Sequence, residues 1–151
     1  MAFAAHMERV ARHLADYGVL AVLPDDKDMA AEMGGQVGYE QFKRAVSRAH
    51  IAKVRDPRTV GILVVNFDKR GIKSYIGPNT FAEIAIAFAD RKKVYLLNGI
   101  PGMYADELSA WGVTDLAGNL EQVAEQFRQT CRPERKSDRN LGKTQLKLPL
   151  S

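Results

Sequence analysis

Glu83 has the most unusual surroundings of any charged residue in this chain of 151 residues. It is the only charge between Lys73 and Asp90, in a segment otherwise rich in Phe, Ala and Ile. A helix that is apolar nearly all round is expected to be buried, and a buried carboxylate is costly unless it has partners or changes its protonation state. Glu83 is therefore the first candidate for a functional carboxylate.

The same residue also fits a purely structural pattern. Thr80 to Glu83 read T-x-x-E, the capping box, in which Glu83 would accept a hydrogen bond from the backbone N–H of Thr80. The partial positive charge of the helix N-terminus would favour the carboxylate as well. Spacing alone thus leaves two interpretations open, a helix cap and a functional group.

The stretch from Thr59 to Pro101 positions this glutamate. Two short apolar runs, Val60–Val65 and Val94–Leu97, have the composition of buried strands. The segment Thr80–Asp90 between them has helical periodicity, with Phe, Ile, Ala and Phe at i, i+3, i+4 and i+7. The stretch therefore predicts a βαβ unit in a parallel sheet, with Glu83 near the edge where open α/β sheets bind ligands.

Polar residues cluster at the same predicted edge. Asn66 and Asn98 follow the two strands and either contact a ligand or act as strand-end turn residues. Tyr75, in the loop before the helix, either stacks on a ligand ring or packs the loop. Asp68, in the same loop, is the best candidate for a second acid beside Glu83.

The remaining elements alternate in type. We expect further helices at about 2–17, 37–54, 104–110 and 120–130, and further strands at about 19–23 and 113–116. This order predicts a single-domain α/β protein with a Rossmann- or flavodoxin-like three-layer fold and a mostly parallel sheet of about 4–5 strands. Doubly wound domains usually begin with a central strand, whereas this chain begins with a helix, so the N-terminal strand is absent.

Composition narrows the class of protein further. No segment has the roughly 18 to 20 apolar residues of a membrane span, and no secretory signal is present at the start. Cys131 is the single cysteine, which fits a cytoplasmic protein. His6, His13 and His50 are scattered, so we expect no metal site and no cofactor.

The C-terminal segment carries the net charge. Arg132 to Ser151 contain six Lys or Arg against one Glu and one Asp, which gives the whole formal charge of +4. The segment lacks helical periodicity, so we predict a folded domain over residues 1–131 and a basic, disordered tail over 132–151. Phosphate contact is the alternative to a solvated tail, but no aromatic residue interleaves the charges as nucleic-acid stacking would require.

The central block also resembles a known family. The residues GIKSYIGPNTFAEIAIAFADRKKVYLLN, preceded by ILVVN, resemble the signature of the nucleoside 2-deoxyribosyltransferase-like superfamily, G-Y-I-G-x-N-T-x-x-E followed by K-x-V-Y-L-L. The opening MAFAAHM resembles the family's G-S-M-x-F-x-x-x-M. The resemblance extends over residues 1 to about 128.

The resemblance implies cleavage or transfer of the N-glycosidic bond of a nucleoside or nucleotide. Glu83 would attack the anomeric carbon as the base departs, as in retaining glycosidases, and the covalent intermediate would pass to water or another base. Asp68 would be the second catalytic residue. The substrate-binding residues implied are Asn66, Tyr75, Gly77, Asn79, Thr80 and Asn98. Family members commonly form homo-oligomers in which a neighbour completes the pocket, so the resemblance implies a homo-oligomer here.

This chain departs from the family at the partner acids. Family transferases carry Asp near the position of Val60 and often an acid at the position of Gly77. Asp68 and Asn79 are candidate substitutes for orienting the substrate or transferring a proton. Because the usual partner acids are missing, a nucleotide-binding or signalling module without turnover is the alternative function.

The resemblance also explains the unusual start. In the family, a strand ending in Gly-Ser precedes the Met-x-Phe with which this chain begins. We expect either a start codon assigned too late or a truncated form. Loss of a central strand would expose the hydrogen-bonding groups of its neighbours, so we expect lower stability and solubility than with the upstream strand present.

Overall fold

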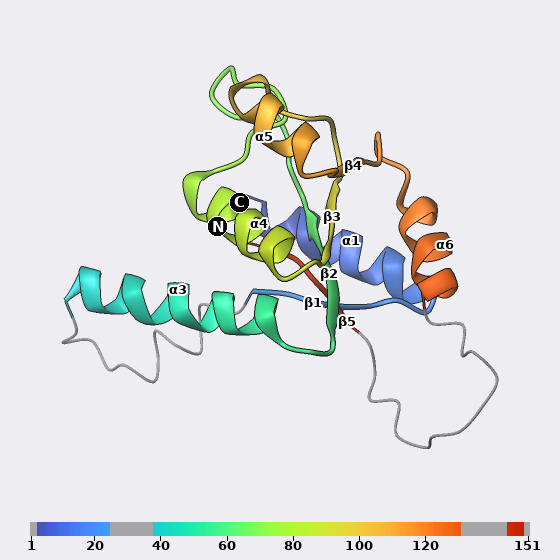
Figure 1. The fold of residues 1–151 in the computed structure, drawn as a ribbon, viewed down its shortest axis with the longest axis horizontal. Coiled ribbons are helices and arrows are strands. Elements are labelled where there is room, and N and C mark those ends of the chain that lie inside the picture. The colour runs from blue at the N-terminus through green and yellow to red at the C-terminus, as the bar shows by residue number, and fades with distance from the viewer. Residues whose placement is uncertain (1–2, 25–37, 131–144, 150–151) are drawn as a thin grey trace.

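Five parallel strands form the centre of the molecule. The computed structural model describes residues 3–24, 38–130 and 145–149 (Figure 1). The strands are β1 (Leu20–Val22), β2 (Thr59–Val64), β3 (Lys93–Leu96), β4 (Thr114–Asp115) and β5 (Gln145–Lys147). Their order in the sheet is β1-β5-β2-β3-β4, and every neighbouring pair is parallel. The predicted α/β class with a parallel sheet is confirmed.

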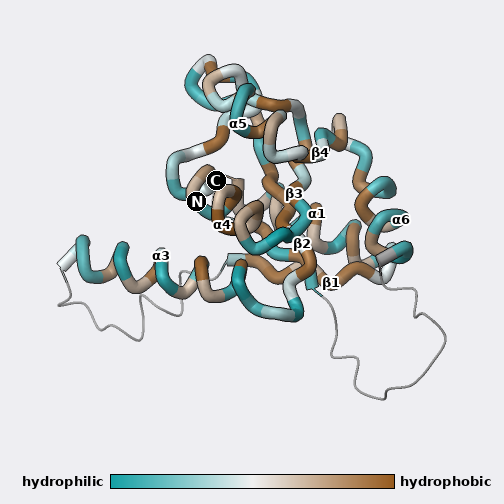
Figure 2. Tube along the Cα trace, in the orientation of Figure 1, coloured by the Kyte–Doolittle hydropathy of each residue, from teal (hydrophilic) through white to brown (hydrophobic). Residues whose placement is uncertain are grey.

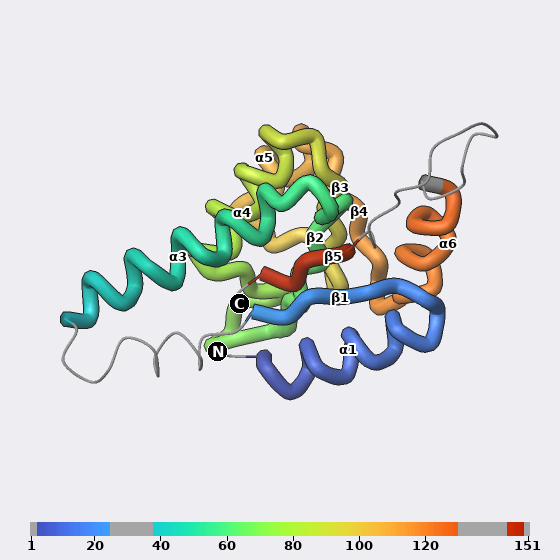
Figure 3. Tube along the Cα trace, turned by 90° about the horizontal axis from the view of Figure 1, so that it is seen from below, coloured from blue at the N-terminus to red at the C-terminus, as the bar shows by residue number. Residues whose placement is uncertain are grey.

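Helices cover both faces of this sheet. They are α1 (Ala4–Asp16), α3 (Tyr39–Arg55), α4 (Pro78–Ala89), the 3-10 turn η1 (Gly102–Tyr104), α5 (Ala105–Ala110) and α6 (Leu120–Thr130). The first and last helices, α1 and α6, pack against one face and against each other. Helices α3, α4 and α5 lie over the other face (Figure 3). The predicted three-layer, Rossmann- or flavodoxin-like arrangement is therefore present.

Alternation along β2 divides the core between the two faces. Leu63 and Val65 join the cluster under α1 and α6, whereas Ile62 and Val64 join the cluster under α3 and α4. All four side chains are fully buried. Strands covered on both faces are mostly apolar, as β2 and β3 are after the polar first residue of each (Figure 2).

The C-terminal segment contributes the middle strand. Gln145 to Lys147 insert as β5 between β1 and β2, and Leu146 and Leu148 are fully buried. The prediction of a disordered tail over 132–151 is wrong for residues 145–149. Leu146 and Leu148 alternate along this short segment, and both are buried in the core under α1 and α6, which holds the segment in the sheet. Residues 132–144 lie outside the described part of the chain.

This strand occupies the position that we expected to be vacant. Leu20, Ala21 and Val22 pair with residues 145–147 on one side, and β2 pairs with the same residues on the other. The ladder groups of β1 and β2 that face this slot are thus satisfied, and the expectation that they are exposed is wrong. A strand from the end of the sequence takes the central position that the first strand holds in a doubly wound domain.

The start of α4 differs from the prediction and excludes the capping box. The helix begins at Pro78, with Gly77 as its N-cap residue and no side-chain hydrogen bond at the cap. Proline is favoured at this first helical position because it has no N–H to satisfy. Thr80 is therefore already inside the first turn, and Glu83 lies one turn further on, too far along to cap the helix.

Candidate functional site

Two asparagines join the loops that follow β2 and β3. The Asn66 amide nitrogen donates to the carbonyl oxygens of Asn98 and Gly99, both at 2.9 Å, and to that of Ser74 at 3.3 Å. Its side-chain oxygen accepts from the Asn98 backbone N–H at 2.9 Å, and the Asn98 amide donates to the Asn66 carbonyl at 2.9 Å. Asn66 is fully buried, and both polar atoms of its side chain are hydrogen-bonded within the fold.

Asp68 shapes the loop that precedes α4. Its carboxylate accepts a hydrogen bond of 2.8 Å from the backbone N–H of Ser74, which has a left-handed backbone with φ of 50°. Such a conformation costs a non-glycine residue about 1–3 kcal/mol unless its surroundings hold it. Tyr75 follows, half-buried, with the Lys69 ammonium 4.9 Å from its ring centroid. Asp68 and Tyr75 therefore both have structural contacts in this loop.

Glu83 is buried between α4 and α3. The residue is 4% exposed, and its Oε1 lies 3.5 Å from Nδ1 of His50. Its second oxygen, Oε2, is buried and makes no hydrogen bond with any residue that the structure describes. An unsatisfied buried acceptor costs about 1–3 kcal/mol, more when it is charged. One oxygen of this buried carboxylate is thus left without a hydrogen bond in the part of the chain that the structure describes.

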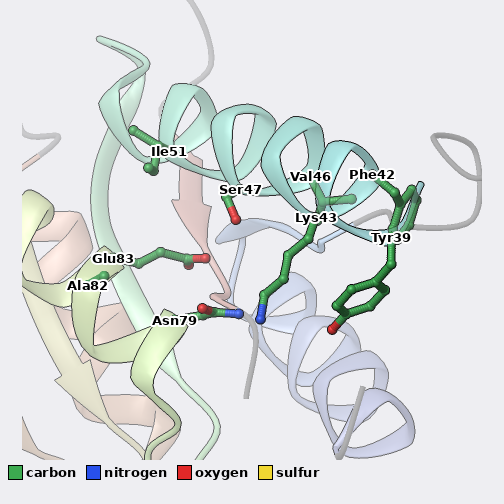
Figure 4. Close-up of a pocket in the computed structure, with 9 residues that line it drawn as sticks. All are labelled: Tyr39, Phe42, Lys43, Val46, Ser47, Ile51, Asn79, Ala82 and Glu83. Carbon is green, nitrogen blue, oxygen red and sulfur yellow. The ribbon is translucent and has the colours of Figure 1, made fainter. Parts of the chain in front are cut away.

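A cavity opens beside this carboxylate (Figure 4). Its volume is about 230 Å³, and it lies between the two helices α3 and α4. It is lined by Tyr39, Phe42, Lys43, Val46, Ser47, Ile51, Asn79, Ala82 and Glu83. Pockets for drug-sized ligands are about 300–1,000 Å³, so this cavity is smaller than most of them.

Polar groups from both helices line the cavity. Figure 4 shows the Glu83 carboxylate and the Ser47 hydroxyl directed into the same space, which Lys43 and Asn79 also line. Lys43 is exposed, and its ammonium lies 5.9 Å from the ring centroid of Tyr39. The cavity therefore has a carboxylate and an amide from α4, and a cation, a hydroxyl and an aromatic ring from α3.

Only some of the expected site residues come together. Glu83 and Asn79 line the same cavity, whereas Asn66, Asp68 and Asn98 do not. Three further expected residues lie close to the cavity along the chain without lining it: Tyr75, Gly77 and Thr80. The Thr80 hydroxyl, one turn before Glu83, is buried and makes no hydrogen bond within the described ranges.

His50 is the residue that sequence reasoning missed. It is 1% exposed and lies on the buried face of α3, four residues after Val46 and four before Val54. That spacing on an apolar stripe could have singled it out from the other two histidines. Lys43 and Ser47 were missed because charged and hydroxyl residues on an amphipathic helix usually face solvent.

The described residues form neither a metal-ligand cluster nor a membrane-spanning helix. Within them, no group of three or more His, Cys, Asp or Glu side chains is placed to hold a metal ion. None of the described helices combines the length and the apolar character that a membrane crossing requires.

Comparisons with known proteins give no match. No protein-family model matches the chain, and neither a curated protein nor a solved structure matches it. The class of protein is therefore defined by its fold and site, an α/β protein with a parallel five-stranded sheet and a buried glutamate beside a cavity.

Proposed function

We propose that this protein cleaves or transfers the N-glycosidic bond of a nucleoside or nucleotide, with Glu83 as the nucleophile. The observation that carries the proposal is the Glu83 carboxylate, which is 4% exposed, lines a cavity and has one oxygen without a hydrogen bond among the described residues. The resemblance of the segment around Glu83 to the nucleoside 2-deoxyribosyltransferase-like superfamily supports it independently.

The proposed reaction has two displacements at the anomeric carbon. Oε2 of Glu83 forms a bond to C1′ while the bond from C1′ to the base nitrogen breaks, and the base leaves with that electron pair and takes up a proton. Water, or a second base, then attacks C1′ and releases Glu83 with loss of a proton. The carboxylate replaces one difficult step by two easier ones.

The neighbours of Glu83 have distinct proposed roles. His50, 3.5 Å from Oε1, orients the carboxylate and leaves Oε2 as the attacking oxygen. Lys43 and Asn79, which also line the cavity, contact polar groups of the substrate that lie outside the sugar. Tyr39 offers a ring on which a base can stack.

A nucleotide-binding module without turnover is the second candidate. One observation favours it: Asp68, the expected partner acid, hydrogen-bonds to Ser74 and does not line the cavity. In that case the cavity binds the ligand and Glu83 contacts it without reacting. In either case we propose a homo-oligomer, from the resemblance, and a cytoplasmic location, from the single cysteine.

Base release tests the proposal directly. The protein is incubated with deoxynucleosides, ribonucleosides and their 5′-monophosphates, and free base is measured by chromatography. We expect release by the wild type and a loss of at least 100-fold in Glu83→Gln, because the amide is a poor nucleophile.

Glu107→Gln is the matched control, since Glu107 is an exposed glutamate on α5. It should retain wild-type release. Release that survives in Glu83→Gln would exclude Glu83 as the nucleophile. Binding of a nucleotide without release of base from any substrate would favour the binding module.

A further inference from the structure

Lys147 is a buried lysine in the middle strand of the sheet. It is 1% exposed, and lysine is almost never fully buried unless it is paired. In the described part of the chain, the buried residues that normally carry a full charge are Lys147 and Glu83. The two have opposite signs.

Strand alternation places both charges on the same side of the sheet. Leu146 and Leu148 belong to the core under α1 and α6, so Lys147 between them faces the opposite layer. Its register partner in β2 is Ile62, which belongs to the core under α3 and α4. Lys147 therefore enters the layer that holds Glu83.

The helices on this side, α3 and α4, pack on β2, the strand next to the one that carries the lysine. Figure 3 shows α3 and α4 on one side of β5 and α1 on the other. His50, 3.5 Å from Glu83, adds a third buried polar side chain to the layer.

We propose that Lys147 is the counter-charge of Glu83, so that the C-terminal strand completes the electrostatics of the site. Removing either charge alone leaves the other in a medium of low dielectric constant, whereas two opposite charges in one layer attract each other. The attraction acts through the layer and needs no direct hydrogen bond between the two groups.

The assignment links the end of the chain to the cavity. Docking of β5 brings Lys147 into the layer at the same time as it completes the sheet. The pairing involves the carboxylate on which the proposed function rests. It does not require that the protein releases a base, so the pairing and the proposed reaction can fail independently.

A double-mutant cycle in the full-length chain tests the pairing. Lys147→Met, Glu83→Gln and the double variant are unfolded with urea, and their midpoints are compared with the wild type. We expect Glu83→Gln to raise the midpoint in the Lys147→Met background, because it removes a charge without a counter-charge. In the wild-type background the same substitution should lower the midpoint or leave it unchanged.

Lys93→Met provides the matched control, since Lys93 is an exposed lysine in a neighbouring part of the same sheet. Its effect should add to that of Glu83→Gln. Additive effects of Lys147→Met and Glu83→Gln would overturn the pairing. Should Lys147→Met not fold alone, recovery of folding in the double variant would support it, and failure of both would overturn it. Lys147→Arg, which keeps the charge, should behave as the wild type in the cycle.

Discussion

The position of Glu83 in its helix separates two roles that its sequence motif could not. The T-x-x-E pattern predicts a cap only if the helix starts at Thr80, but Pro78 starts it two residues earlier. The fixed backbone angle and the missing N–H of proline favour that earlier start. The glutamate consequently lies on the second turn, where its side chain reaches α3 and the cavity and not the helix end.

Two asparagines that were both predicted to bind substrate have different roles in the structure. Asn66 is fully buried and its amide nitrogen donates to three carbonyl oxygens, whereas Asn79 is exposed and lines the cavity. Both were expected to bind substrate from their positions in the sequence. The sequence could not separate the two roles, because two of the hydrogen-bond partners of Asn66 lie 32 and 33 residues away along the chain.

Asn66→Ala tests the structural assignment. We expect it to lower the free energy of unfolding by about 2–4 kcal/mol, because the buried carbonyls of two loops lose their donor. The measurement is denaturant unfolding, with Asn79→Ala as the control that should change the free energy by less than about 0.5 kcal/mol. An equal effect of the two substitutions would argue against the special role of Asn66.

Among the elements, β5 was the least predictable from sequence. Its three residues follow a basic segment, and their alternation of Gln, Leu and Lys is too short to signal a strand. What makes it a strand is the slot between β1 and β2, which only the assembled sheet provides. By contrast, α1, β2 and α4 were predictable, because each is longer and its apolar residues form a recognisable pattern in the sequence.

Leu146→Ala measures how firmly β5 belongs to the sheet. Leu146 is fully buried under α1 and α6, so the substitution should lower the free energy of unfolding by about 2–5 kcal/mol. Leu20→Ala in the neighbouring strand β1 is the control, since Leu20 is 47% exposed. A loss for Leu146→Ala no larger than that for Leu20→Ala would mean that the C-terminal segment is not held in the sheet.

The candidate site was predictable to the extent that it lies on one periodic segment. Glu83 could be found because a lone charge interrupts an apolar helix. His50 lies 33 residues earlier, on a different helix, and nothing local in the sequence brings the two together. The packing of α3 against α4, which is a property of the whole layer, creates both the contact and the cavity.

At the scale of the whole molecule, the two edges of the sheet are built differently. The loops with Asn66 and Asn98 lie at the carboxyl ends of the strands. At the amino ends, the Lys92 ammonium donates to the carbonyl oxygens of Asp56 and Thr59, at 2.7 and 2.6 Å. Burial lowers the pKa of Lys92, with the nearby aspartates opposing the shift. These contacts tie the end of α3 to the start of β2 and β3, which fixes the position of α3 at the cavity.

Asp56 makes this amino-terminal edge sensitive to acid. The Arg58 guanidinium and backbone N–H hydrogen-bond to its carboxylate and lower the pKa of Asp56 from 3.8 to about 2. Because the pKa is lower in the folded state than in the unfolded state, the carboxylate contributes stability above about pH 4, and this contribution is lost as the pH falls towards 2. Arg58 is exposed and Asp56 is partly exposed, so salt should weaken the effect.

Asp56→Asn should therefore have a Tm below that of the wild type at pH 7, and the difference should shrink as the pH is lowered from 4 to 2. Thermal unfolding at pH 7, 4, 3 and 2 measures it, with Asp106→Asn, an exposed aspartate on α5, as the matched control. A difference in Tm that stays constant over this range would show that Asp56 acts through its turn geometry and not through its charge. A shrinking difference would locate the acid sensitivity at the junction that orients α3, the helix that carries His50 and Lys43 to Glu83.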